Sequence, residues 1–139
     1  MAARFVEPPD NASATDMDRL RVRAATLADA DVAAYSQYVQ ARRRSGRESP
    51  ETVEALQAAV DVPLQVAAIS AEVAAVAEAL ATDGNPRLRG DASTGCWLAA
   101  GAAASAALLV AENVPGDARV EEANRYARRA RDAASRLGG

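Results

Sequence analysis

The stretch that decides the fold runs from Gly84 to Asn113 and reads GNPRLRGDASTGCWLAAGAAASAALLVAEN. A polar turn with two glycines leads into twenty residues, 92–111, that carry no formal charge. A helix that is apolar on all sides is buried by its own protein, by a partner or by lipid. We therefore expect this helix to be enclosed at the centre of the fold. Asp91 at its start and Asn113 at its finish are then expected to face one shared cleft.

Start and stop signals for further helices surround this segment. Thr15 followed by Asp18 has the pattern of a capping box, and Ser49-Pro50 supplies an N-cap and a proline at the first helical position. Pro63 is expected to break or kink the next stretch, and no segment alternates with the period of a strand. The expected helices span residues 15–43, 50–61, 63–82, 91–113 and 117–137. The predicted fold class is all-α, an antiparallel bundle of about five helices around the small-residue apolar helix.

The length of 139 residues predicts a single domain, 1–139, whose first fifteen residues form an extended, apparently truncated segment containing Pro8 and Pro9. The chain has no histidine and no lysine. Their absence excludes Ser-His-Asp and Cys-His catalysis, Schiff-base chemistry and most zinc sites. Any proton transfer must then use Asp, Glu, Tyr or water, and we expect no metal site.

Charge and cysteine content narrow the class of protein further. The net charge of −3 argues against nucleic-acid binding. Cys96 is the only cysteine, so no internal disulfide can form. No apolar leader segment is present in residues 1–10, and together these features predict a cytoplasmic protein.

The uncharged helix is long enough to cross a bilayer, but its middle is Ala, Gly and Ser rather than Leu and Ile. Acidic flanks without a basic cluster also favour burial in a bundle, which leaves a membrane-associated helix as the weaker alternative. Gly101 and Ser105 form a small-residue stripe that lets a second helix approach closely. Full burial in so small a bundle is easiest when a second subunit covers one side, so we expect a homodimer.

Asp31 is the first candidate for chemistry, because it interrupts an apolar stripe made of Leu20, Ala24, Leu27, Ala34 and Tyr38. A carboxylate buried there suits acid–base work, and Tyr35 follows one turn later. Alternatively, Asp31 lies at the edge of the stripe and meets an arginine. The spacing alone leaves both interpretations open.

The polar residues around the uncharged helix have simple structural explanations. Asp91 suits a helix N-cap, Asn85 follows a glycine that ends a helix, and Asn113 precedes a proline at a helix end. Cys96 and Trp97 are expected to pack in the core.

Taken together, four blocks resemble the cyclodeaminase/cyclohydrolase family. This is the helical domain at the C-terminal end of formiminotransferase-cyclodeaminase, which also occurs alone in bacterial methenyltetrahydrofolate cyclohydrolases. The blocks are LADADVAAY at 27–35, AAVDVPL at 58–64, the Gly84-Asn85 and Asp91-Ala92 turn, and Asn113 after the apolar helix. The family's Pro-Gly-Gly-Gly-Ser loop is not present, as though the chain began inside the domain.

The resemblance implies a folate one-carbon enzyme, a lyase or a hydrolase. It would either close 5-formiminotetrahydrofolate with loss of ammonia or hydrolyse 5,10-methenyltetrahydrofolate. Asp31 or Asp91 would act as the acid–base group, and Tyr35, Asn85 and Asn113 would orient the substrate. The tetrahydrofolate derivative is the substrate, and no permanently bound cofactor is expected. The alternative is a non-catalytic helical dimer that keeps the fold without the glycine-rich loop.

Overall fold

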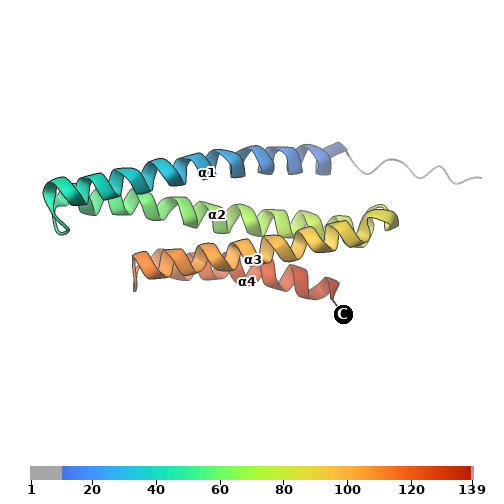
Figure 1. Ribbon diagram of the computed structural model, residues 1–139. Coiled ribbons are helices and arrows are strands. Elements are labelled where there is room, and N and C mark those ends of the chain that lie inside the picture. The colour runs from blue at the N-terminus through green and yellow to red at the C-terminus, as the bar shows by residue number, and fades with distance from the viewer. Residues whose placement is uncertain (1–10, 139) are drawn as a thin grey trace, which may run out of the picture.

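The computed structural model describes residues 11–138, and within that range it contains helices and no strand. The elements are α1 Asn11–Ser45, α2 Pro50–Asp83, the short 3-10 helix η1 Pro86–Leu88, α3 Arg89–Asn113 and α4 Ala118–Leu137. The all-α prediction is confirmed. The expected number of helices is wrong, because four α-helices stand where five were predicted. The helices are long rods, and each runs antiparallel to the next one in the chain (Figure 1).

The difference in number arises at Pro63, which lies inside the continuous helix α2. Proline removes one backbone hydrogen bond and normally breaks or kinks a helix. Here Val62 and Pro63 are both buried, and Val62 belongs to the cluster that joins α2 to Leu20 and Leu27 of α1. Packing of α2 against its neighbours therefore outweighs the local cost of the proline.

The predicted helix starts have mixed outcomes. Ser49 caps α2 by accepting a hydrogen bond from the Thr52 amide, as expected. The capping box at Thr15 is wrong, because α1 already begins at Asn11. The prediction of an extended segment therefore fails for 11–15, and its remainder, 1–10, lies outside the described residues. Asp91 is not an N-cap either, since α3 begins at Arg89 and Asp91 lies in its first turn.

The central element is α2, which packs against α1, α3 and α4. Helix α1 packs mainly on α2, whereas α3 and α4 pack on each other and on α2. The turn between α1 and α2 and the turn after α3 lie at one end of the bundle, and η1 lies at the other (Figure 1). The expectation that the uncharged helix would be central is therefore wrong.

The core is built mostly from alanine. Ten buried residues join α2, α3 and α4 in one cluster, and all of them except Cys96 are alanines. Small side chains let the three helices approach closely, as the composition suggested. Cys96 is fully buried, and its thiol donates to the Ala74 carbonyl oxygen at 3.3 Å, so the expected core position of this cysteine is confirmed.

One side of α3 is not covered by the rest of residues 11–138. Trp97 and Leu109 are each 50% exposed, Leu98 is 71% exposed and Leu108 is 65% exposed. The expectation that protein encloses this helix on every side is therefore wrong for the single chain, and so is the core position expected for Trp97. A helix placed at the edge of a four-helix bundle buries only the stripe that faces its neighbours.

Helix α2 and the segment Pro86–Asn113 are each long and apolar enough to cross a membrane. In each, 39% of the most apolar window is buried against the rest of the chain. A core helix of a soluble bundle passes the same test of length and composition. The property is therefore weak evidence for a membrane location.

Candidate functional site

Asp31 and Tyr35 lie together on the outer side of α1, and both are exposed to solvent. They line an open hollow of about 490 Å³ whose lining residues all belong to α1, including Val39 and Arg43. The interpretation of Asp31 as a buried carboxylate is therefore wrong. The structure shows no ion pair between Asp31 and an arginine within residues 11–138 either. A hollow on a single helix face, with no opposing wall, does not exclude water from a reaction.

Asn85 and Asp91 lie near each other in sequence, on either side of η1. The Asn85 side chain accepts a hydrogen bond from the Arg87 amide at 3.0 Å and so caps η1. Just before it, Gly84 approaches the end of α2 so closely that a Cβ atom would lie 2.3 Å from the Leu80 carbonyl oxygen. Its φ of −82° is open to any residue. The close approach to Leu80, and not the backbone conformation, is therefore what requires a glycine at position 84.

Asn113 lies at the opposite end of α3. Its side-chain amide donates to the Leu109 carbonyl oxygen at 2.8 Å, which satisfies a carbonyl of the last helical turn. Asp91 and Asn113 are 22 residues apart on one helix, which corresponds to about 33 Å at the rise of an α-helix. The prediction that they share a cleft is therefore wrong within one chain.

The five candidate residues thus occupy three separate places: the middle of α1, the η1 end and the far end of α3. Asp31 and Tyr35 are also separated from Asp91, because α1 packs mainly on α2 and the hollow that they line contains residues of α1 only. A site that contains both Asp91 and Asn113 is therefore not formed within residues 11–138 of one chain.

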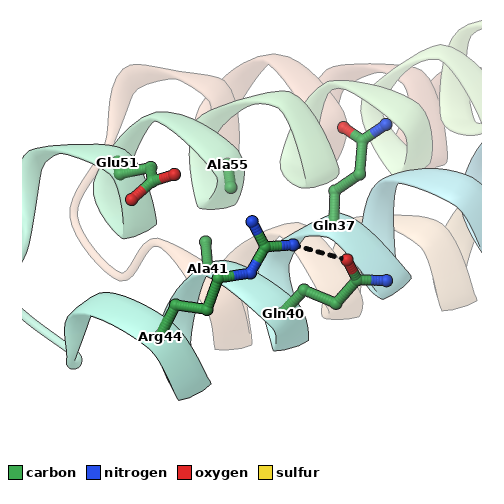
Figure 2. A pocket seen from close by; sticks show the side chains of 6 residues that line it. All are labelled: Gln37, Gln40, Ala41, Arg44, Glu51 and Ala55. Carbon is green, nitrogen blue, oxygen red and sulfur yellow. Dashed lines mark hydrogen bonds between the residues drawn. The ribbon is translucent and has the colours of Figure 1, made fainter.

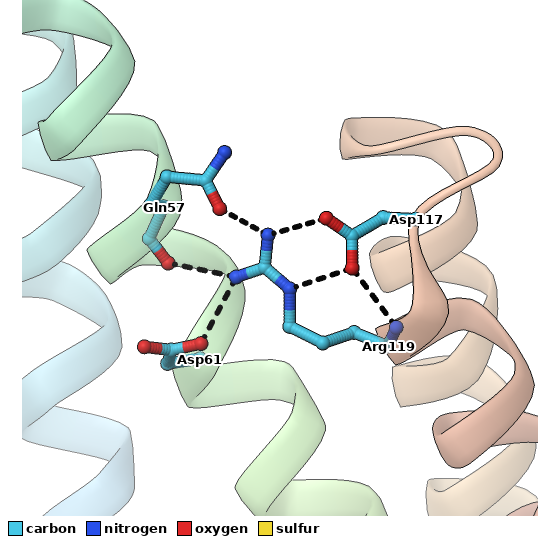
Figure 3. A network of polar contacts seen from close by, with 4 residues as sticks. All are labelled: Gln57, Asp61, Asp117 and Arg119. Atoms are coloured by element: carbon cyan, nitrogen blue, oxygen red, sulfur yellow. Dashed lines mark hydrogen bonds and ion pairs between the residues drawn. The ribbon is translucent and has the colours of Figure 1, made fainter.

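A polar network that the sequence did not reveal joins α4 to α2 (Figure 3). The Arg119 guanidinium donates to both carboxylate oxygens of Asp117 at 3.0 Å and to Asp61 at 3.0 Å. It also donates to the backbone and side-chain carbonyl oxygens of Gln57. Hydrogen bonds from Arg119 lower the pKa of Asp117 from 3.8 to about 2. The spacing Asp117-x-Arg119 at a helix start was the available sequence signal.

A second polar hollow, of about 240 Å³, lies between the end of α1 and the start of α2 (Figure 2). Arg44 donates to the Gln40 side chain at 3.0 Å, and Glu51 accepts from Ser45 at 2.6 Å. Three of the polar side chains that line this hollow, Gln40, Arg44 and Glu51, thus already form hydrogen bonds within the chain. None of the five candidate residues lines it.

No group of three or more His, Cys, Asp or Glu side chains in the described part of the chain is placed to hold a metal ion. The groups that can act on a ligand are carboxylates, amides, guanidinium groups and tyrosine hydroxyls. Such groups can hydrogen-bond a planar heterocycle and transfer protons.

Comparison with known proteins assigns the family. The family model described as formiminotransferase-cyclodeaminase matches residues 5–132. No curated protein and no solved structure gives a match to the chain. The matched range contains all five candidate residues and nearly the whole bundle. The chain belongs to the formiminotransferase-cyclodeaminase family.

Proposed function

We propose that the protein acts on a one-carbon derivative of tetrahydrofolate, by cyclodeamination of the 5-formimino form or by hydrolysis of the 5,10-methenyl form. The observation that carries the proposal is the family match over residues 5–132. The matched range includes Asn85 and Asp91 beside η1 and Asn113 at the end of α3. These side chains supply a carboxylate and two amides, which suit a reaction that needs proton transfer and no metal.

We further propose that the site forms between two copies of the chain. The exposed face of α3 consists of Leu98, Gly101, Ser105 and Leu108, at alternating steps of three and four residues. This order is nearly symmetric about residue 103. Two copies of α3 packed antiparallel therefore place each Leu98 near Leu108 of the partner subunit, with the small residues at the crossing.

The same pairing brings an Asp91 side chain close to an Asn113 side chain, which a single chain does not do. Residues Asp91 and Asn113 lie almost equally far from residue 103, so the symmetric pairing sets Asp91 beside Asn113 of the partner subunit. Asp91 lies twelve residues from residue 103 and Asn113 ten, so the mismatch is two residues, or roughly 3 Å along the helix. A two-fold dimer then has two equivalent sites, each built from the η1 end of one copy and the far end of the other. Asp31 and Tyr35 remain outside these sites, and we therefore assign the acid–base role to Asp91.

In the cyclodeamination, N10 of the folate attacks the formimino carbon, and a C–N10 bond forms. The Asp91 carboxylate accepts the proton that N10 loses and returns it to the departing nitrogen as the C–NH2 bond breaks and ammonia leaves. In the hydrolysis, Asp91 accepts a proton from the water that attacks the methenyl carbon and delivers it to N5 as the C–N5 bond opens. The second proton of the attacking water, on the new hydroxyl group, is released to solvent as the formyl C=O bond forms. The amides of Asn85 and Asn113 hydrogen-bond the heterocycle and hold it in place.

The test is the decay of 5,10-methenyltetrahydrofolate, read by its ultraviolet absorbance, and the release of ammonia from the 5-formimino form. Asp91→Asn should lower turnover by about 100-fold or more. Asp83→Asn, which changes an exposed acid near the same turn, is the matched control. Retained turnover in Asp91→Asn together with loss in Asp31→Asn would move the acid–base role to α1.

Mixing two inactive variants tests the shared site directly. A dimer of one Asp91→Asn chain and one Asn113→Ala chain contains one site with both native residues. Random reassociation should restore roughly a quarter of the wild-type activity, because half of the dimers are mixed and each has one intact site. No recovery from a verified mixture would contradict a site made by two copies.

A non-catalytic helical dimer is the second candidate function. It is favoured by the exposure of Asp91 to solvent and by the separation of the candidate residues within one chain. This alternative predicts stable pairing without turnover of either folate substrate. We place the protein in the cytoplasm and propose no nucleic-acid partner and no permanent cofactor.

A further inference from the structure

The outer face of α1 carries an acid and a base at opposite ends of an apolar centre. Residues spaced by four form one ridge along a helix. The α1 ridge has four members at this spacing, which all line the hollow of about 490 Å³: Asp31, Tyr35, Val39 and Arg43. Tyr35 in its centre is 63% exposed. The ridge is thus an apolar surface that begins with a negative charge and ends with a positive one.

Neither charge is balanced within the part of the chain that the structure describes. The side chains of Asp31 and Arg43 form no hydrogen bond and no ion pair among residues 11–138. No position three or four residues from Asp31 carries a base, and none three or four residues from Arg43 carries an acid. Neighbours on the helix therefore do not compensate either charge. Both groups are available to pair with another molecule.

The α1 ridge lies on an outer surface of the bundle. The buried side chains of α1, such as Leu20 and Leu27, contact α2 instead, and every residue that lines the hollow belongs to α1. At the turn between α1 and α2, both helices extend past the turn that joins α3 to α4 (Figure 1). A further helix can therefore pack on the ridge without displacing any described part of the chain.

The α1 ridge is complementary to itself. Tyr35 and Val39 each lie two residues from position 37. Asp31 and Arg43 each lie six residues from the same position. Two antiparallel copies of α1 that cross at position 37 therefore set each Asp31 beside Arg43 of the partner subunit. A parallel arrangement would set like charges together, so the charges select the two-fold, antiparallel one.

We propose that the α1 ridge is a second contact between copies of the chain, separate from the exposed face of α3. Its two-fold symmetry repeats each interaction, so the contact contains the Asp31–Arg43 ion pair twice and the packing of Tyr35 on Val39 twice. The ridge is only about 18 Å long. A contact of this size is small for a stable dimer, so it forms at high protein concentration and joins dimers that pair through α3. The α1 contact itself requires neither pairing at α3 nor turnover of a folate.

Sedimentation equilibrium of the full chain tests the α1 contact in a Gly101→Glu background, in which a charge blocks the proposed α3 pairing. We expect a monomer at low protein concentration and a dimer at high concentration. Added salt should weaken this dimer, because exposed ion pairs are screened. A monomer at every concentration would overturn the proposal.

Charge reversals in the same background identify the residues that meet. Asp31→Arg sets two arginines against each other at both ends of the contact and should weaken self-association by at least about tenfold. Arg43→Asp should do the same, because two acids then meet. An equimolar mixture of the two variants should associate as the unreversed chain does, since each introduced charge then meets one of opposite sign.

Asp29→Arg and Arg47→Asp are the matched controls, because they make the same charge changes at exposed positions outside the hollow. Self-association of each should stay within about twofold of the unreversed chain. Circular dichroism checks that every variant is folded. Equal losses in Asp29→Arg and Asp31→Arg, or no association in the mixture of the two ridge variants, would contradict the α1 contact.

The outcome can be told apart from the fate of the proposed function. Turnover of a folate by a chain that shows no association through α1 contradicts the α1 contact and leaves the enzyme activity standing. Association that follows the charges of Asp31 and Arg43, in a protein without turnover, supports the α1 contact and contradicts catalysis.

Discussion

The Arg119 guanidinium lies 3.0 Å from the Asp61 carboxylate, although the two residues are separated by 58 positions in the sequence. This ion pair joins the first turn of α4 to the middle of α2 (Figure 3). The Arg119 side chain is only 17% exposed, and Asp117 binds the same guanidinium from the other side. The contact thus ties the start of α4 to α2.

Removing this connection should cost stability. Arg119→Gln leaves Asp61 and Asp117 without their common partner, and we expect the free energy of unfolding to fall by about 1–3 kcal/mol. Urea unfolding followed by circular dichroism measures the loss. Arg125→Gln changes an exposed arginine of the same helix and should shift the midpoint by little. Equal effects of the two substitutions would contradict the structural role of Arg119.

Low pH should reduce the stability that the hydrogen bonds between Arg119 and Asp117 contribute. Hydrogen bonds from Arg119 hold the pKa of Asp117 at about 2 in the folded chain, against 3.8 as the ordinary value. Because the folded pKa is the lower one, the stabilisation is complete above pH 3.8 and is lost as the pH falls toward 2. Between pH 5 and pH 2, the free energy of unfolding should fall less steeply with decreasing pH in Asp117→Asn than in the wild type. Identical pH profiles would count against this linkage.

Two glycine substitutions should change the stability of the protein in opposite directions. Gly84→Ala places a Cβ atom 2.3 Å from the Leu80 carbonyl oxygen, so the turn must shift; we expect a loss of about 1–3 kcal/mol. Gly95→Ala meets nothing within 4 Å and lies inside α3. It should stabilise the protein by about 0.5–1 kcal/mol, because alanine favours the helix. Thermal unfolding of both variants checks the signs.

Cys96 should be protected from reagents in the folded protein. Its thiol is fully buried, and burial raises the pKa of the Cys96 thiol, so little thiolate forms. Modification by a thiol-specific disulfide reagent should be at least about 100-fold slower in buffer than in denaturant. A Thr94→Cys/Cys96→Ala variant, with its thiol on the exposed side of α3, supplies the accessible control. Fast modification of native Cys96 would contradict the packing of α3 on α2.

Pairing through the exposed face of α3 can be tested at Gly101. A Cβ atom at this position meets nothing within 4 Å in the single chain, so Gly101→Glu should fold. It places a charge at the proposed crossing and should convert a dimer into a monomer in light scattering. Val32→Glu, at an exposed apolar position on α1, is the control. A wild type that is monomeric at high concentration, or soluble only with detergent, would argue against pairing in water.

Much of the local structure could be predicted from the sequence. Ser49 before Pro50 marked the start of α2, and Asp117 marked the start of α4, because a cap acts on residues within one turn of itself. The high alanine content predicted helices with small, closely packed faces, and the order of four short motifs identified the family. Of the candidate site, the sequence supplied the residues and their chemistry.

The tertiary structure decided what these local signals could not. Helix α2 continues through Pro63 because α2 is packed against its neighbours there, and α3 lies at the edge with its leucines exposed because α2 takes the centre. The contact of Arg119 with Asp61 likewise depends on how helices pack. Caps and helix propensity act between neighbours in sequence, whereas the covered face of a helix is set by residues distant in sequence. The chemistry of each helix end was thus encoded locally, and its position in space was fixed only by packing.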